Sequence, residues 1–354
     1  MPSNTWNINA VRAREAMTLI VDQFGPDFGW GSIAVAHLDT GFSNHIVFNL
    51  ASTQPALRVA DGLNFMDANT SEPRDPLNYS GGPTINPGHG TRTLGVLCGN
   101  LPGTFTGVCP GVPVIPYRIT NGVMLTGATI NNAALAIMDA VDRNLADVIS
   151  ISLGVQSVVG NLKEMHALGR AVDHAYERGV IVVGAAGQTQ DAPQLVGFTV
   201  YPGRYSRAIL VGGINSDLEV CFDYEIGSSD VDVWAPADDI RRPNSVFGLA
   251  EPFIDVAQTG DGTSYATVHV AGAAAMWLRM HGDALDQGGY AGWRKVEAFR
   301  AMLRANNKAL AGNDVMNRKT PKGAGILDCV GLLKGKLPKL DSLKKAALAE
   351  PQVN

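Results

Sequence analysis

Three short stretches of the 354-residue chain place a potentially reactive side chain among glycines and other small residues. They are H-L-D-T-G at residues 37–41, P-G-H-G-T at 87–91 and G-D-G-T-S at 260–264. Their reactive groups are the carboxylate of Asp39, the imidazole of His89 and the hydroxyl of Ser264. An imidazole oriented by a carboxylate can take the proton of a hydroxyl, which then attacks a carbonyl carbon. Together the three stretches predict nucleophilic acyl transfer.

Taken one at a time, these side chains also have ordinary structural explanations. Asp39 follows an apolar run and could simply end a strand, and Ser264 could cap the helix expected after it. The order Asp, His, Ser along the chain is one of three orders known for catalytic triads, and it favours the catalytic interpretation. Ser264 would then stand at a helix N-terminus, where backbone N–H groups can stabilise an anion.

The three motifs resemble the signatures of the subtilisin-like serine proteases, the subtilases. Further resemblance to this family lies in V-I-S-I-S-L-G (148–154), G-A-A-G-Q (184–188), Y-P-G-R-Y (201–205), W-A-P-A (234–237) and G-A-G-I-L-D (323–328). The resemblance implies a serine endopeptidase that works through an acyl-enzyme. In it Ser264 would attack, His89 would transfer the proton, and Asp39 would orient His89.

Several positions depart from the residues that the family usually has. The resemblance places one oxyanion donor on the side chain of residue 188, where the family usually has Asn and this chain has Gln188. Gln carries the same amide on a longer stem, so we expect Gln188 to donate with one more torsion to restrain. Arg92 stands where the family more often has His; it could steer acidic groups, but we expect it to pair on the surface.

The resemblance also implies where a substrate would bind. An extended peptide would pair with Ser152–Gly154 and with the segment Asn121–Leu125 by adding a strand. Residues expected to contact the substrate are Ser152, Leu153, Gly154, Ala186, Gly187 and Val200. Val200 stands where the family often has Gly, and its β-branched side chain predicts a shallow pocket for P1, the residue before the cleaved bond. Small or medium apolar P1 residues are therefore expected.

The elements that must position these residues follow from hydrophobic periodicity. Six apolar, β-branched runs predict strands buried on both faces: 32–38, 114–119, 148–152, 180–185, 209–213 and 231–235. Helical stripes over 129–143 and 165–176 fall between them. The alternation predicts an α/β fold of three layers, a mostly parallel sheet with helices on both faces, as in subtilisin. We expect an N-terminal extension (1–30), a catalytic domain (31–333) and a C-terminal tail (334–354).

Composition narrows the possible partners and the compartment. The net charge of −5 leaves no basic surplus for nucleic acid, and no apolar run is long enough to span a membrane. The four cysteines form no C-x-x-C pair, which predicts free thiols. No signal peptide or propeptide is evident, so a cytoplasmic location is expected. The chemistry requires no cofactor. Structural calcium, common in the family, stays an open alternative, although no acidic cluster clearly matches one of the family's calcium sites.

Three functions remain open on the sequence alone. The first is an endopeptidase that processes a specific peptide or protein. The second is a peptide cyclase or ligase on the same scaffold, in which an amine replaces water at the acyl-enzyme; residues 43–87 are the candidate lid. The third is a pseudoprotease that binds peptides without turnover, suggested by Gln188 in place of Asn.

Overall fold

The computed structural model describes residues 5–52, 55–82, 84–155, 162–188, 199–221, 231–310 and 325–349. At its centre is a six-stranded sheet in the order β4-β1-β5-β6-β7-β8, with every neighbouring pair parallel. The strands are β1 (Val35–Asp39), β4 (Val114–Arg118), β5 (Val148–Ile151), β6 (Ile181–Ala185), β7 (Ile209–Ile214) and β8 (Val233–Pro236). All of their residues are buried, which confirms the expectation drawn from their continuous apolar runs.

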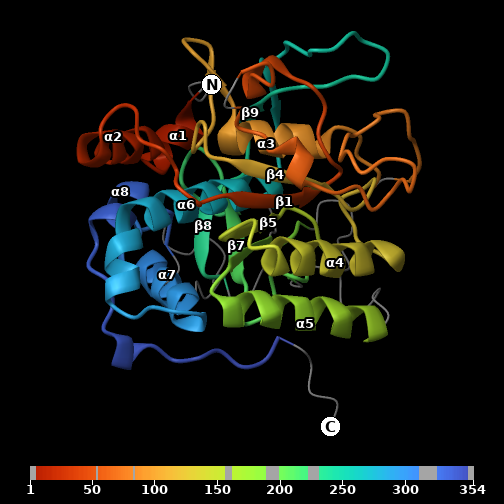
Figure 1. The fold of residues 1–354 in the computed structure, drawn as a ribbon. Helices are drawn as coiled ribbons and strands as arrows, with labels where there is room; N and C mark the ends of the chain where they lie inside the picture. Colours follow the sequence, from red (N-terminus) through yellow and green to blue (C-terminus); the bar gives the residue numbers. More distant parts are fainter. Residues whose placement is uncertain are drawn as a thin grey trace.

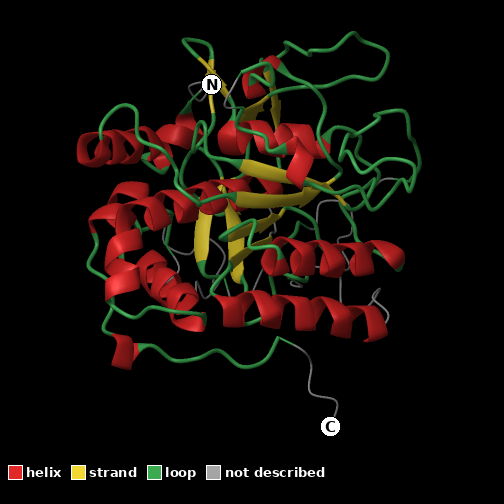
Figure 2. Ribbon diagram, in the orientation of Figure 1, coloured by secondary structure: helices red, strands yellow, loops and turns green. Residues whose placement is uncertain are grey.

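Helices cover both faces of the sheet (Figures 1 and 2). One face carries α3 (His89–Cys98), α6 (Thr263–Gln287), α7 (Trp293–Ala305) and α8 (Cys329–Lys334), and the other carries α4 (Ala128–Asp142) and α5 (Leu162–Arg178). Alternate residues of each strand face the two layers, so Val35 packs on the α6 side and Ala36 on the α4 side. The three-layer α/β fold predicted from the sequence is confirmed.

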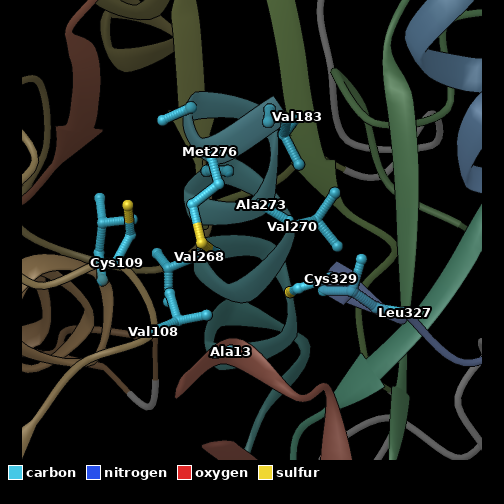
Figure 3. Close-up of a cluster of buried hydrophobic side chains, with 14 of the residues drawn as sticks. Ala13, Val108, Cys109, Val183, Val268, Val270, Ala273, Met276, Leu327 and Cys329 are labelled. Carbon is cyan, nitrogen blue, oxygen red and sulfur yellow. The ribbon is translucent and has the colours of Figure 1, made fainter. Parts of the chain in front are cut away.

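The small residues of α6 allow this helix to lie deep in the core. Figure 3 shows Val268, Val270 and Met276 of α6 among side chains that other elements contribute. A β-carbon added to Gly272 would lie 2.6 Å from Val108 Cγ1, so a larger residue would have to displace its neighbours. The four cysteines are buried and none of them is in a disulfide, as predicted. Burial raises the pKa of Cys98 to about 12, which keeps this thiol protonated.

Short elements complete the described chain. Helices α1 (Trp6–Ala10) and α2 (Ala13–Phe24) pack on the α6 side, and the hairpins are β2 (Asn100–Leu101) with β3 (Phe105–Thr106) and β9 (Ile240–Arg242) with β10 (Gln258–Gly260). Single-turn helices are η1 (Ile46–Phe48), η2 (Val59–Asp61) and η4 (Leu340–Ser342). No helix of the described ranges is long and apolar enough to cross a membrane. Parts of the 43–87 connection, of the 323–328 motif and of the C-terminal tail lie outside the described residues.

Two ends of the described chain are tied to the core by hydrogen bonds. Trp6 Nε1 donates to the carbonyl of Asp239 at 3.2 Å, which fastens α1 beside the start of β9. Near the other end, the backbone N–H of Ala346 donates to Tyr176 Oη at 2.8 Å, and the N–H of Ala349 donates to Asp173 Oδ1 at 2.8 Å. The residues after α8 therefore run along α5.

Candidate active site

A buried carboxylate and an imidazole meet where β1 ends and α3 begins. Asp39 is the last residue of β1 and His89 is the first of α3, and His89 Nδ1 lies 2.7 Å from Asp39 Oδ1. Burial alone would raise the pKa of Asp39, but the adjacent His89 and hydrogen bonds from His89 and from the Thr40 N–H bring it below its usual value. The carboxylate is therefore ionised at neutral pH, and Nδ1 must be the donor.

Glycine makes this meeting of two elements possible. A β-carbon on Gly90 would collide with the carbonyl oxygen of Gly41, because the first turn of α3 lies directly on the turn that follows β1. Gly41 itself has φ +96°, a conformation that favours glycine. The close approach of the two backbones thus explains the glycine at position 90.

A second histidine lies near the pair. His37 is buried in β1, with Nε2 3.0 Å from Thr93 Oγ1 and 3.8 Å from Asp39 Oδ2. Burial lowers the pKa of His37 to about 4, so its ring is neutral at physiological pH. His37 therefore supports the buried side of the carboxylate as an uncharged polar neighbour.

Ser264 lies at the same end of the sheet as Asp39. It is the second residue of α6, and its Oγ donates to the carbonyl of Ser152 at 2.8 Å, while Ser152 Oγ donates to the carbonyl of Ser264 at 3.0 Å. Leu38 of β1 is opposite Ile151 of β5, so Ser152 is the next position along and lies beside Asp39. Because neighbouring strands are only about 4.8 Å apart, the residue that binds Ser264 is next to Asp39.

Asp39, His89 and Ser264 thus lie at the same end of the sheet, with one difference from the predicted triad. Among the residues that the structure describes, the Ser264 hydroxyl has the Ser152 carbonyl as its partner instead of the His89 ring.

Gln188 and the Ser264 amide border the same turn. Gly262 precedes α6, and a β-carbon added to it would lie 2.9 Å from Gln188 Oε1 and 3.8 Å from the Ser264 nitrogen. The backbone N–H of Gly187 donates to Thr263 Oγ1 at 3.2 Å, which ties the segment after β6 to the start of α6. Gln188 is exposed, so its amide is open to solvent on this side.

The sequence profile of the subtilase family matches residues 31–318 of the chain. The chain belongs to the subtilase family. It is 30% identical over 306 residues to the major intracellular serine protease of Bacillus subtilis, and the alignment covers 82% of each chain. It is 31% identical over 252 residues to the intracellular serine protease of Paenibacillus polymyxa, over 69% of this chain and 66% of that one.

Solved structures share the fold of this subtilase. MycP1 with its N-terminal propeptide removed superposes with a TM-score of 0.64 at 21% identity, over 94% of this chain and 98% of that one. The prenylagaramide maturation protease PagA superposes with a TM-score of 0.61 at 19% identity, over 85% and 92%. With the family match, the protein is a subtilisin-like serine peptidase, a hydrolase that acts on peptides or proteins.

The residues expected to bind the peptide backbone in this subtilase are paired with each other. The N–H of Gly154 donates to the Val123 carbonyl at 3.2 Å, and the N–H of Leu125 donates to the Gly154 carbonyl at 2.8 Å. Met124 and Gly154 form a parallel bridge. A peptide could pair with these same backbone groups only by replacing these two hydrogen bonds.

Val200 fills the space beside the predicted P1 pocket. A β-carbon on Gly154 would collide with the Val200 side chain, and one on Gly187 would lie 3.0 Å from Val200 Cγ1. Val200 thus lies against both segments that should line the pocket. Ser152, Leu153 and Ala186, also expected there, are buried.

The surface role expected for Arg92 is wrong. Its side chain is only 9% exposed, and the guanidinium donates to the Pro87 carbonyl at 2.9 Å and to Asn86 Oδ1. Arg92 is buried because the tight turn before α3 faces the first turn of the helix, and oxygens of Asn86 and Pro87 in that turn accept hydrogen bonds from the guanidinium. Arg92 therefore holds the turn that leads into His89.

Sequence reasoning also missed Asp75. This carboxylate is buried, 4% exposed, and contacts Thr40 and Gly88, which flank Asp39 and His89. Its surroundings, E-P-R-D-P-L, show neither helical nor strand periodicity and match no motif. Two prolines close to a single acidic residue predict a turn and nothing more.

Two buried histidines predict how the stability of the fold depends on pH. Burial lowers the pKa of His37 and of His269 to about 4, whereas an unfolded histidine titrates near 6.5. Between pH 7 and 5 the unfolded chain binds more protons, so the free energy of unfolding should fall as the pH is lowered, by up to about 1.4 kcal/mol per pH unit for each histidine. Urea unfolding across this range measures the slope. His37→Gln should make it shallower, and a flat wild-type profile would contradict the prediction.

Proposed function

We propose that this subtilase is a cytoplasmic endopeptidase that processes a specific peptide or protein through Ser264, His89 and Asp39. The observation that carries the proposal is the 2.7 Å contact between His89 Nδ1 and the ionised Asp39. Ser264 lies beside the same end of the sheet. Relatives named as intracellular serine proteases support the location. These residues and the oxyanion donors supply each proton transfer and charge contact of acyl transfer, so we propose no cofactor for the chemistry.

The proposed mechanism follows from the donor at His89 Nδ1. Because Nδ1–H is used on Asp39, the neutral ring has Nε2 as its acceptor. When substrate binds, Ser264 Oγ would exchange the Ser152 carbonyl for Nε2, lose its proton to the ring and attack the scissile carbonyl. The imidazolium would then protonate the leaving amine, and water would release the acyl group. The ionised Asp39 stabilises the imidazolium throughout.

The oxyanion would form at the start of α6. The Ser264 N–H is one proposed donor, since first-turn N–H groups of a helix are free to bind an anion. Gln188 is the other, and its position across the Gly262 turn from that N–H supports the assignment. An exposed Gln side chain has more freedom to lose than Asn, so the donor would be less preorganised.

The first experiment compares the wild-type protein with Ser264→Ala on a peptide library. We expect cleavage by the wild type and none above background by the variant, because only the hydroxyl can form the acyl-enzyme. A fluorophosphonate probe should label the wild type at Ser264 and leave the variant unlabelled. Equal activity of both proteins would refute the mechanism, and an unlabelled, inactive wild type would favour the pseudoprotease. Product masses that match joined or cyclic peptides would favour the ligase.

Removal of the Gln188 amide should slow the chemical step. We expect Gln188→Ala to lower kcat about 10²-fold, the lower end of the effect of losing one oxyanion donor, with KM little changed. Gln188→Glu keeps the length of the side chain but removes the donor, so it should lose at least as much. Steady-state kinetics on one good substrate measures both. A kcat of Gln188→Ala equal to that of the wild type would remove this residue from the mechanism.

The size of the P1 pocket should depend on Val200. We expect the wild type to prefer Ala, Val or Leu at P1, and Val200→Gly to raise kcat/KM for Phe relative to Ala at P1 by tenfold or more, about 1.4 kcal/mol. The reason is that the Val200 methyl groups lie between Gly154 and Gly187. Val246→Ala is the control, since Val246 is 45% exposed. A wild-type preference for aromatic P1 residues would show that the pocket has been placed wrongly.

A further inference from the structure

Asp75 is a buried carboxylate held entirely by neutral donors. It lies in the irregular segment between η2 and α3, and in the described part of the chain no Lys or Arg forms an ion pair with it. Its Oδ2 accepts from Thr40 Oγ1 at 2.8 Å, from the Gly88 N–H at 2.8 Å and from Tyr79 Oη at 3.0 Å. Its Oδ1 accepts from the Leu77 N–H at 3.0 Å. A buried charge persists only when such donors replace the water it has lost.

Two of these donors belong to residues that flank the catalytic pair. Thr40 directly follows Asp39, and Gly88 directly precedes His89. Thr40 Oγ1 also accepts from the N–H of Gly90, the residue after His89, at 3.0 Å. Asp75 and the Thr40 hydroxyl thus hold the backbone on both sides of His89 against the end of β1.

The carboxylate is itself held in place by the turn after β1. The N–H of Asp75 donates to the Phe42 carbonyl at 2.8 Å, and the N–H of Phe42 donates to the Pro73 carbonyl at 3.1 Å. Asp75 therefore moves with the chain that follows Asp39. Its negative charge also lies at the start of α3, where the helix dipole favours an anion.

We propose that Asp75 is a positioning residue for catalysis: it sets the separation and orientation of His89 and Asp39 by bonding to Gly88 and Thr40. The inference rests on the proposed function of Ser264, His89 and Asp39. Asp39 and His89 come from separate elements, and no covalent constraint fixes the 2.7 Å between them. A carboxylate that binds both neighbouring backbones supplies that constraint, and a misplacement of about 1 Å at a reacting group can cost about 10² in rate.

The test compares kinetics and folding of three variants at Asp75 and its neighbours. Asp75→Ala should lower kcat about 10²-fold with KM changed less than threefold, because substrate contacts remain while the pair loosens. Asp75→Asn keeps the shape and one acceptor, so it should fall between Asp75→Ala and the wild type. Tyr79→Phe is the matched control: it removes the hydroxyl that binds Asp75 and also interacts with Thr40, but it leaves the bonds from Thr40 and Gly88 to Asp75 in place, so kcat should stay within twofold of the wild type.

Two further readouts separate positioning from general stability. The downfield proton NMR signal of the His89–Asp39 hydrogen bond should broaden or shift in Asp75→Asn and stay unchanged in Tyr79→Phe. Thr40→Val should lower kcat as Asp75→Ala does, and the double variant should lose little more, because both act through one network. If Asp75→Ala fails to fold, the Asp75→Asn kinetics and NMR signal decide the matter.

The outcomes distinguish this inference from the proposed function. If Asp75→Asn and any folded Asp75→Ala keep the wild-type kcat and NMR signal while Ser264→Ala is inactive, Asp75 has no positioning role and the proposed function stands. Equal losses in Tyr79→Phe and Asp75→Asn would also overturn the inference, since the loss would then follow from any damage to the segment. Full activity of Ser264→Ala would overturn the proposed function itself.

Discussion

The hydrogen bond from His89 to Asp39 is the constraint around which the site is built. It joins residues 50 positions apart in the chain, one at the end of a central strand and one at the start of a helix. Asp39 has to stay charged while fully buried, and that is possible because His89 and the Thr40 N–H bind its oxygens and outweigh the effect of burial on its pKa. The neutral His37 behind it adds a polar surrounding without a competing positive charge.

The end of β5 is the second meeting point. Ser152 exchanges two hydrogen bonds with Ser264, and Gly154, two residues on, is paired with Val123 and Leu125. The proposed nucleophile and the backbone proposed to bind a peptide thus have internal hydrogen-bond partners in this structure. Because main-chain and hydroxyl groups are costly to leave unpaired, a ligand that displaced these partners would have to offer equivalent hydrogen bonds in exchange. The proposed binding of an extended peptide would meet this requirement, since that conformation presents N–H and C=O groups at the spacing of a strand.

The irregular chain between β1 and α3 has a larger part in the site than its sequence indicates. On the sequence, residues 43–87 are the candidate lid of a cyclase or ligase. Where they are described, they pair with the turn after β1 through Phe42 and deliver a buried carboxylate, Asp75, to the backbone around His89. Arg92 then binds the turn immediately before the helix. Such contacts depend on which polar groups face one another after folding, and no periodic pattern records that.

The sequence by itself determined the fold class and predicted Asp39, His89 and Ser264 as the catalytic residues. Strand and helix patterns report burial directly, and the glycine-rich motifs reflect backbone contacts too close for any side chain. Only the tertiary structure decided the partners: Ser264 bonded to Ser152, Arg92 buried instead of exposed, and Asp75 placed beside the pair. The physical reason is the separation along the sequence over which each property is set. Apolar periodicity is a local property of the chain, whereas a hydrogen bond depends on two groups brought to within about 3 Å by segments far apart in sequence.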